Sequence, residues 1–112
     1  MKLLPNDIEK KLRANYEVNA GKEQTIDHKP VVKFFHPVGS ATWLITELDP
    51  DNIMFGLCDL GHGSPEMGYV ALSELKETLA FNMPIERDRY FEADKTLTEY
   101  ANEARKFRGI SA

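Results

Sequence analysis

Residues 31–72 read VVKFFHPVGSATWLITELDPDNIMFGLCDLGHGSPEMGYVAL, and this stretch decides the predicted fold. Its apolar residues recur with a period of two, which is typical of strands, over segments 31–36, 41–48, 53–60 and 67–72. The segments are separated by turn-forming residues at 36–39, 49–52 and 61–65. Because connections this short favour antiparallel neighbours, we expect a meander in the order of the sequence.

The predicted strands are apolar on both faces, so each face needs a cover. Residues 5–18 predict one helix, whose stripe Leu4, Ile8, Leu12 and Tyr16 has four-residue spacing. Residues 96–109 predict another, which starts at a Thr96–Glu99 capping box and stops near a glycine. These two helices are the expected covers of the sheet.

Two shorter segments follow the predicted sheet. Residues 73–80 predict a short helix, and residues 85–91 predict either an edge strand or an extended strap. The predicted fold class is therefore α+β: a four- to five-stranded antiparallel meander flanked by N-terminal and C-terminal helices, in a single domain over residues 1–112. The expected core residues are Ile8, Leu12, Trp43, Phe55, Leu57 and Tyr100.

Composition limits the function classes. The chain has 18 acidic and 14 basic residues, a formal net charge of −4, which argues against direct binding of nucleic acid. Cys58 is the single cysteine, so no internal disulfide forms, and the apolar runs are too short to span a bilayer. We expect a cytoplasmic protein with no membrane partner.

Catalytic and metal sites have weak support. Asp59, His62 and Glu66 bring three donor types to one glycine-rich turn, but their spacing matches no familiar metal-ligand pattern. Cys58 has no cationic neighbour in the sequence to activate it, and no phosphate-binding, dinucleotide-binding or nucleophile-elbow motif occurs. We therefore expect no metal, no cofactor and no catalytic residue.

Two charged segments are the candidate binding residues. In the first, Glu86, Arg87 and Asp88 alternate in charge; Arg87 or Arg89 either recognises an anion or pairs with an internal acid such as Glu47 or Asp59, and we favour the internal pair. In the second, the candidates are Glu47, Asp49 and Asp51. They form either an acidic patch for a basic protein surface or a solvated turn.

Several short blocks together resemble one bacterial family, which is filed as the domain of unknown function 2958. Over residues 1 to about 91 they are MKLL at 1–4, VKFF at 32–35 with Pro37 and Gly39, TW at 42–43 with TE at 46–47, FGL at 55–57, EMGYV at 66–70 with LSEL at 72–75, and PIERD at 84–88. The resemblance implies no activity. It implies an accessory protein of plasmids, phages and other mobile elements.

Two hypotheses follow for function. The first is a non-enzymatic interaction protein whose partner is a host protein, modulating a defence or DNA-processing factor. The second is a ligand-binding module or enzyme with a site near the 61–66 turn and the 86–89 segment. A deep pocket with convergent polar groups would favour the second, and a flat acidic or aromatic surface would favour the first.

Overall fold

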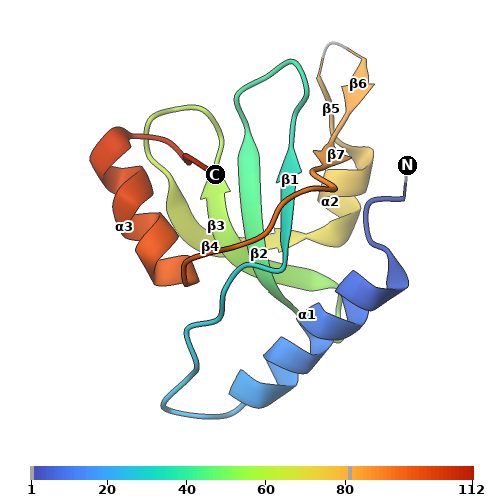
Figure 1. Cartoon of the computed structure of the whole chain (residues 1–112). Helices are drawn as coiled ribbons and strands as arrows, with labels where there is room; N and C mark the ends of the chain where they lie inside the picture. Colours follow the sequence, from blue (N-terminus) through green and yellow to red (C-terminus); the bar gives the residue numbers. More distant parts are fainter. Residues whose placement is uncertain (1, 81) are drawn as a thin grey trace.

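The structure is a computed structural model that describes residues 2–80 and 82–112 (Figure 1). Its elements, in chain order, are α1 (Asn6–Asn19), β1 (Val32–Phe35), β2 (Thr42–Leu48), β3 (Ile53–Asp59), β4 (Glu66–Ala71), α2 (Leu72–Glu77), β5 (Leu79–Ala80), β6 (Met83–Pro84), β7 (Glu86–Arg87) and α3 (Leu97–Phe107). The predicted α+β class is confirmed.

The main sheet has five antiparallel strands in the order β4-β3-β2-β1-β7. The predicted meander is therefore present in β1 to β4. β5 and β6 form a separate two-stranded hairpin. Of the 85–91 segment, only Glu86 and Arg87 pair with β1, and the chain then crosses as a strap to α3, so both interpretations of this segment hold in part.

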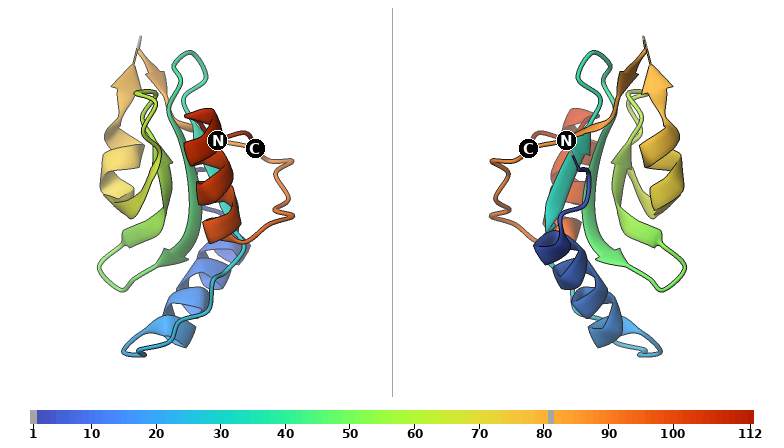
Figure 2. Two further views of the ribbon diagram at one scale, coloured as in Figure 1. Left: turned by 90° about the vertical axis from the view of Figure 1, so that its left-hand side faces the viewer. Right: turned by 90° about the vertical axis from the view of Figure 1, so that its right-hand side faces the viewer.

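Two buried clusters lie on opposite faces of the sheet, because neighbouring strand residues point to opposite sides. One cluster joins β1, β2 and β3 to Leu12 of α1 and to Leu72 and Leu75 of α2. The other joins Leu44 and Leu57 to the apolar face of α3. The edge-on views show α2 and α3 on either side of the sheet (Figure 2). The expectation that both faces are covered is confirmed, with α2 as an additional cover.

The helix ends follow local chemistry. In α3 the Thr96 hydroxyl accepts from the Glu99 amide, and the Glu99 carboxylate accepts from the Thr96 amide, so the predicted capping box is present. α1 begins one residue after Pro5, whose carbonyl accepts from the Glu9 amide at 2.9 Å. Both predicted helices are thus confirmed to within two residues at each end.

Two of the expected core residues are only half-buried. Leu12, Trp43, Leu57 and Tyr100 are buried, whereas Ile8 and Phe55 pack at the margins of the two clusters. For Phe55 the reason is that its face of the sheet is hollow beyond the N-terminal end of α3, as described next.

Candidate functional site

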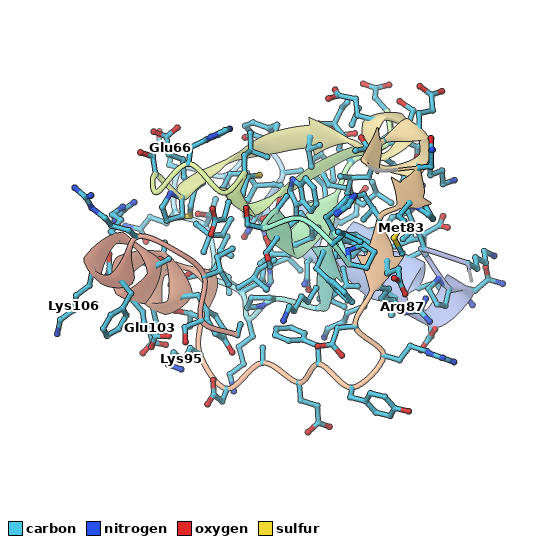
Figure 3. The ribbon with its side chains drawn as sticks, turned by 90° about the horizontal axis from the view of Figure 1, so that it is seen from above. Glu66, Met83, Arg87, Lys95, Glu103 and Lys106 are labelled. Carbon is cyan, nitrogen blue, oxygen red and sulfur yellow. The ribbon has the colours of Figure 1, made fainter. Side chains whose placement is uncertain are left out.

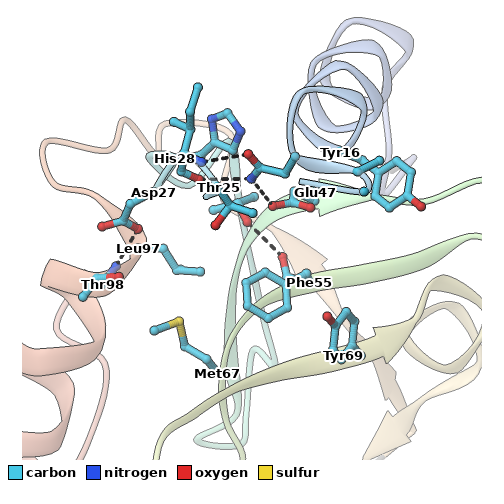
Figure 4. Close-up of a pocket in the computed structure, with 15 residues that line it drawn as sticks. Tyr16, Thr25, Asp27, His28, Glu47, Phe55, Met67, Tyr69, Leu97 and Thr98 are labelled. Atoms are coloured by element: carbon cyan, nitrogen blue, oxygen red, sulfur yellow. Dashed lines mark hydrogen bonds between the residues drawn. The ribbon is translucent and has the colours of Figure 1, made fainter. Parts of the chain in front are cut away.

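A hollow of about 490 Å³ lies between the C-terminal end of α1, the loop 20–28, strands β2 to β4 and the start of α3 (Figure 4). Its lining mixes polar and apolar side chains, with aromatic and acidic residues among them. The residues used below are Tyr16, Asp27, Glu47, Phe55, Met67 and Tyr69. We call this hollow the Glu47 pocket.

A β-bulge directs Glu47 into the pocket. Ile45 pairs with Gly56, but the next pair is Glu47 with Phe55, so Thr46 is an extra residue in β2. Without the bulge, strict alternation would place Glu47 on the same face as Ile45, towards the α1 and α2 core. The bulge instead puts Glu47 beside Phe55, and Leu48 takes the inward position with Ile45.

Polar contacts hold the bulge. The buried Thr46 donates its hydroxyl to the carbonyl of Phe55 at 3.3 Å, and its own carbonyl accepts from the Asn15 side-chain amide at 3.0 Å. The backbone carbonyl of the extra residue is therefore bonded to α1, and its side chain is bonded to β3. This fixes the direction of the Glu47 side chain.

The loop that closes the pocket is tied down at both ends. Asn19 exchanges hydrogen bonds with the backbone of Ile26 and also donates from Nδ2 to Glu47 Oε2 at 3.0 Å. At the other end, the Asp27 carboxylate accepts from the amide of Thr98, and the His28 carbonyl accepts from the amide of Leu97. These contacts attach the loop to the N-terminal end of α3, where an acidic group is stabilised by the helix dipole.

Strand β4 borders the pocket and has a free outer edge. It is the last strand of the sheet, and its neighbour β3 lies on one side only. The Leu72 amide donates to the Asn52 carbonyl, in register with the β3–β4 ladder. Since hydrogen-bonding direction alternates along an antiparallel strand, the backbone groups of Gly68 and Val70 face β3, and those of Met67 and Tyr69 face outward. The Tyr69 side chain is 75% exposed and stacks on Phe55 with ring centroids 5.1 Å apart.

A second hollow, of about 510 Å³, lies on the opposite face and is lined mainly by apolar groups, Trp43, Cys58, Val70 and Leu75 among them. Burial raises the pKa of the Cys58 thiol to about 11. At neutral pH the thiol is protonated and is not a competent nucleophile. Cys58 therefore acts as a small apolar residue in the lining of this hollow.

The predicted acidic patch does not converge on one site. Glu47 enters the pocket, but Asp49 uses Oδ1 to accept from the amides of Asp51 and Ile53, which closes the β2–β3 turn. The Asp51 side chain is exposed in that turn. Of the three acids, Glu47 lines the pocket, and Asp49 and Asp51 belong to a solvated turn.

The predicted charged segment is mainly structural. Glu86 and Arg87 form β7, and Asp88 accepts at Oδ1 from the Tyr90 amide and lies 3.8 Å from Lys33 Nζ. The expected pairing of Arg87 with a carboxylate is wrong. Its Nη1 donates to the backbone carbonyl of Lys2 at 2.6 Å, and Arg87 takes part in none of the ion pairs within the described residues.

Asp59 is also not the acid that Arg87 or Arg89 uses. It is buried, and its two oxygens accept from the amides of Gly61 and Ile110, at 2.9 and 3.0 Å, which attaches the C-terminal tail to the sheet. The turn at 61–66 leads into β4, whereas β7 is the opposite edge of the sheet, and Glu66 and Arg87 lie far apart (Figure 3). The structure does not assemble one site from these two segments.

The strap after β7 is fixed to α3 by a local polar cluster. The Tyr100 hydroxyl donates to Asp94 Oδ1 at 2.9 Å, and Lys95 lies 3.3 Å from the same oxygen. These two contacts lower the pKa of Asp94. Within residues 2–80 and 82–112, no three His, Cys, Asp or Glu side chains are close enough to hold a metal ion. The described helices also include none that is long and apolar enough to cross a membrane.

Of the residues that form the site, Glu47 alone was predicted as a binding residue, and Asn15, Asn19, Thr46 and Tyr69 are among those that were missed. Asn15 and Asn19 lie on α1 at a four-residue spacing, on the side that faces the β2 bulge, and this spacing is the one signal that was available. Thr46 gives no such signal, because a bulge of this kind does not require glycine. Tyr69 was treated as an ordinary strand residue.

Comparison with known protein families gives one match. The model of the family described as "Protein of unknown function (DUF2958)" matches residues 3–111. The chain belongs to this family. The match extends beyond the blocks that carried the resemblance, which ended near residue 91, and it includes α3. Searches of curated proteins and of solved structures found no match.

Proposed function

We propose that this member of the DUF2958 family is a non-enzymatic protein-binding module that adds an extended segment of a partner protein to strand β4. The observation that carries the proposal is the outer edge of β4, where, among the strands of residues 2–80 and 82–112, none pairs with the backbone groups of Met67 and Tyr69. An unpaired strand edge of this kind is the template for β-strand addition.

The two edges of the sheet differ in a way that supports this choice. Soluble proteins protect sheet edges with very short strands, lysine, proline or bulges. The β7 edge is two residues long, and a strap follows it. The β4 edge has six residues, contains neither lysine nor proline, pairs with β3 without a register shift and exposes Tyr69. β4 therefore lacks the protection that β7 has.

The Glu47 pocket gives this edge a means of selecting its partner. In strand addition the main-chain hydrogen bonds supply affinity, and pockets for alternate side chains supply specificity. Met67 and Tyr69, whose backbone groups face outward, also line the Glu47 pocket. Side chains on one face of an added strand would project over this pocket.

A host protein in the cytoplasm is the proposed partner. The mobile-element setting implied by the family resemblance favours a host factor involved in defence or DNA processing. The net charge of −4 favours a protein over a nucleic acid, because phosphate backbones attract basic surfaces.

The experiment selects linear peptides from a phage-displayed library on the wild-type protein and tests them on edge variants. Tyr69→Pro removes an outward N–H but no bond to β3, so we expect a folded protein whose peptide affinity falls by at least about tenfold. Met67→Pro tests the second outward N–H in the same way.

Two control variants show whether the loss of affinity comes from the backbone N–H or from the side chain, and whether it is specific to β4. Tyr69→Ala keeps the outward N–H, so it should lose less affinity than Tyr69→Pro. Tyr90 lies on the strap and is 91% exposed. The Tyr90→Ala variant should therefore bind the selected peptides with the affinity of the wild type. Equal affinity of the wild type and both folded proline variants, or a library that yields no binders, would contradict the proposal.

A further inference from the structure

The Glu47 pocket contains negative charge without a balancing cation. Glu47 and Asp27 line it, and neither lysine nor arginine is among its lining residues. Asp27 caps the start of α3, where the helix dipole offsets its charge. Glu47 is half-buried, and the hydrogen bond that it accepts comes from the neutral amide of Asn19. Within the described residues it takes part in no ion pair.

The imidazole of His28 is an ionisable base in this lining, and it is already engaged. His28 lines the pocket, but its Nε2 lies 3.3 Å from the backbone carbonyl of Asn15, which needs this nitrogen as a donor. The imidazole is thereby held by α1. The carboxylate of Glu47 remains available to a group from outside the chain.

Three aromatic side chains line the same pocket. They are Tyr16 from α1, Phe55 from β3 and Tyr69 from β4 (Figure 4). Phe55 and Tyr69 pack with their ring planes at 51°. A ring face attracts an organic cation within about 6 Å of its centroid, and the attraction increases when the cation leaves water. A carboxylate and aromatic rings that line one pocket are the combination that recognises an alkylammonium or guanidinium group.

We propose that the Glu47 pocket binds an organic cation, with Glu47 as its counter-ion and the rings of Tyr16, Phe55 and Tyr69 as its walls. If a partner segment occupies β4 as proposed above, the cation is a lysine or arginine side chain of that segment; this last step rests on the proposed function. The pocket's volume of about 490 Å³ lies within the range of roughly 300–1,000 Å³ that small-ligand sites occupy.

The first arm of the test uses free probes on the full chain and needs no partner. N-acetyl-lysine amide, N-acetyl-arginine amide and the uncharged N-acetyl-norleucine amide are titrated while backbone amide NMR shifts are followed. We expect both cations to shift the amides of Glu47, Phe55 and Tyr69 saturably, and norleucine to bind at least about tenfold more weakly.

The matched variant is Glu47→Gln, which keeps the shape of the side chain and removes its charge. We expect this variant to bind the two cationic probes about tenfold more weakly than the wild type and to bind the norleucine probe with unchanged affinity. Glu77→Gln on α2 makes the same charge change at an exposed position outside the pocket and should have no effect. Equal shifts for all three probes, or cation binding that survives Glu47→Gln, would overturn the proposal.

The second arm distinguishes the source of the cation. In the peptides selected on β4, each lysine or arginine is replaced in turn by norleucine. If the cation comes from the segment, replacing one particular lysine or arginine of the peptide weakens its binding to the wild type by about tenfold. The same replacement leaves its binding to the Glu47→Gln variant unchanged. Free probes that bind while no peptide engages β4 would uphold the pocket and reject the strand-addition function. Peptides that engage β4 with no preference for a cation would uphold strand addition and reject the assignment of the cation to the partner segment.

Discussion

Gly56 lets β3 approach β2 closely next to the bulge. A Cβ at this position would lie 2.0 Å from the carbonyl oxygen of Leu44 and 2.8 Å from the Cα of Ile45. Both obstacles are backbone atoms, so they do not move aside as a side chain would. Gly56→Ala should therefore destabilise the fold by about 1–3 kcal/mol or more, measured by denaturant unfolding.

Gly68 supplies the matched control for that substitution. It pairs directly with Gly56 across the β3–β4 ladder, but a Cβ there would meet nothing within 4 Å. Gly68→Ala should leave the free energy of unfolding within about 0.5 kcal/mol of wild type. Equal losses of stability in both variants would mean that the close contact at Gly56 is not the cause of the destabilisation in Gly56→Ala.

Cys58 gives a prediction for pH dependence. Its pKa is raised to about 11 by burial, so in the folded protein the reactive thiolate is scarce until the pH approaches that value. Alkylation by iodoacetamide should be at least about tenfold slower at neutral pH than in the unfolded chain, where the thiol pKa is about 8.5. The rate of alkylation in the unfolded chain should level off above the thiol pKa of about 8.5, whereas the rate in the folded protein should still rise steeply above that pH. Coincident pH profiles for the two states would show that the thiol is solvated.

Among the elements, α3 has the most clearly encoded start. The capping box satisfies two backbone amides, and Leu97 behind it is buried against Leu44 and Leu57. Thr96→Ala should cost about 1 kcal/mol of stability. Thr98→Ala, two residues further along on an exposed position, is the control and should cost less than about 0.5 kcal/mol. A thermal midpoint unchanged in Thr96→Ala would show that tertiary packing alone sets the start of α3.

Elements defined by local rules were predictable, and those defined by pairing were not. The Thr96–Glu99 box and the turn residues around Pro50 and Gly63 act within a few residues of chain, so the sequence displays them. The bulge at Thr46 depends on how β2 meets β3 and α1. Strict alternation would put Leu44 and Leu48 on one face, but they lie in different clusters because the bulge intervenes.

The same difference explains why the candidate site was predicted only in part. The sequence indicates Glu47 as a candidate binding residue, together with Asp49 and Asp51, which lie near it in the chain. In the structure Asp49 and Asp51 belong to the turn instead. The actual neighbours of Glu47 are Asn19 from α1 and Phe55 from β3. Long-range contacts of this kind follow from the register of the sheet, which the spacing of residues in the chain does not specify.

For the whole molecule, charge gives a further prediction. The chain carries −4, and the proposed partner segment is cationic where it meets Glu47. Attraction of this kind is screened by salt, with a Debye length that falls from about 10 Å at 0.1 M to about 3 Å at 1 M. Peptide affinity should decrease over this range in the wild type and change less in Glu47→Gln. A salt dependence that is identical in the two proteins would remove Glu47 from the interface.

The outward direction of the β4 backbone is the central claim, and amide hydrogen exchange measures it residue by residue. In the free protein the amides of Met67 and Tyr69 should exchange rapidly, while those of Gly68 and Val70, which face β3, exchange slowly. When a selected peptide is bound, Met67 and Tyr69 should become protected. Protection of Met67 and Tyr69 already in the free protein, or exchange at both that peptide binding leaves unchanged, would contradict the account.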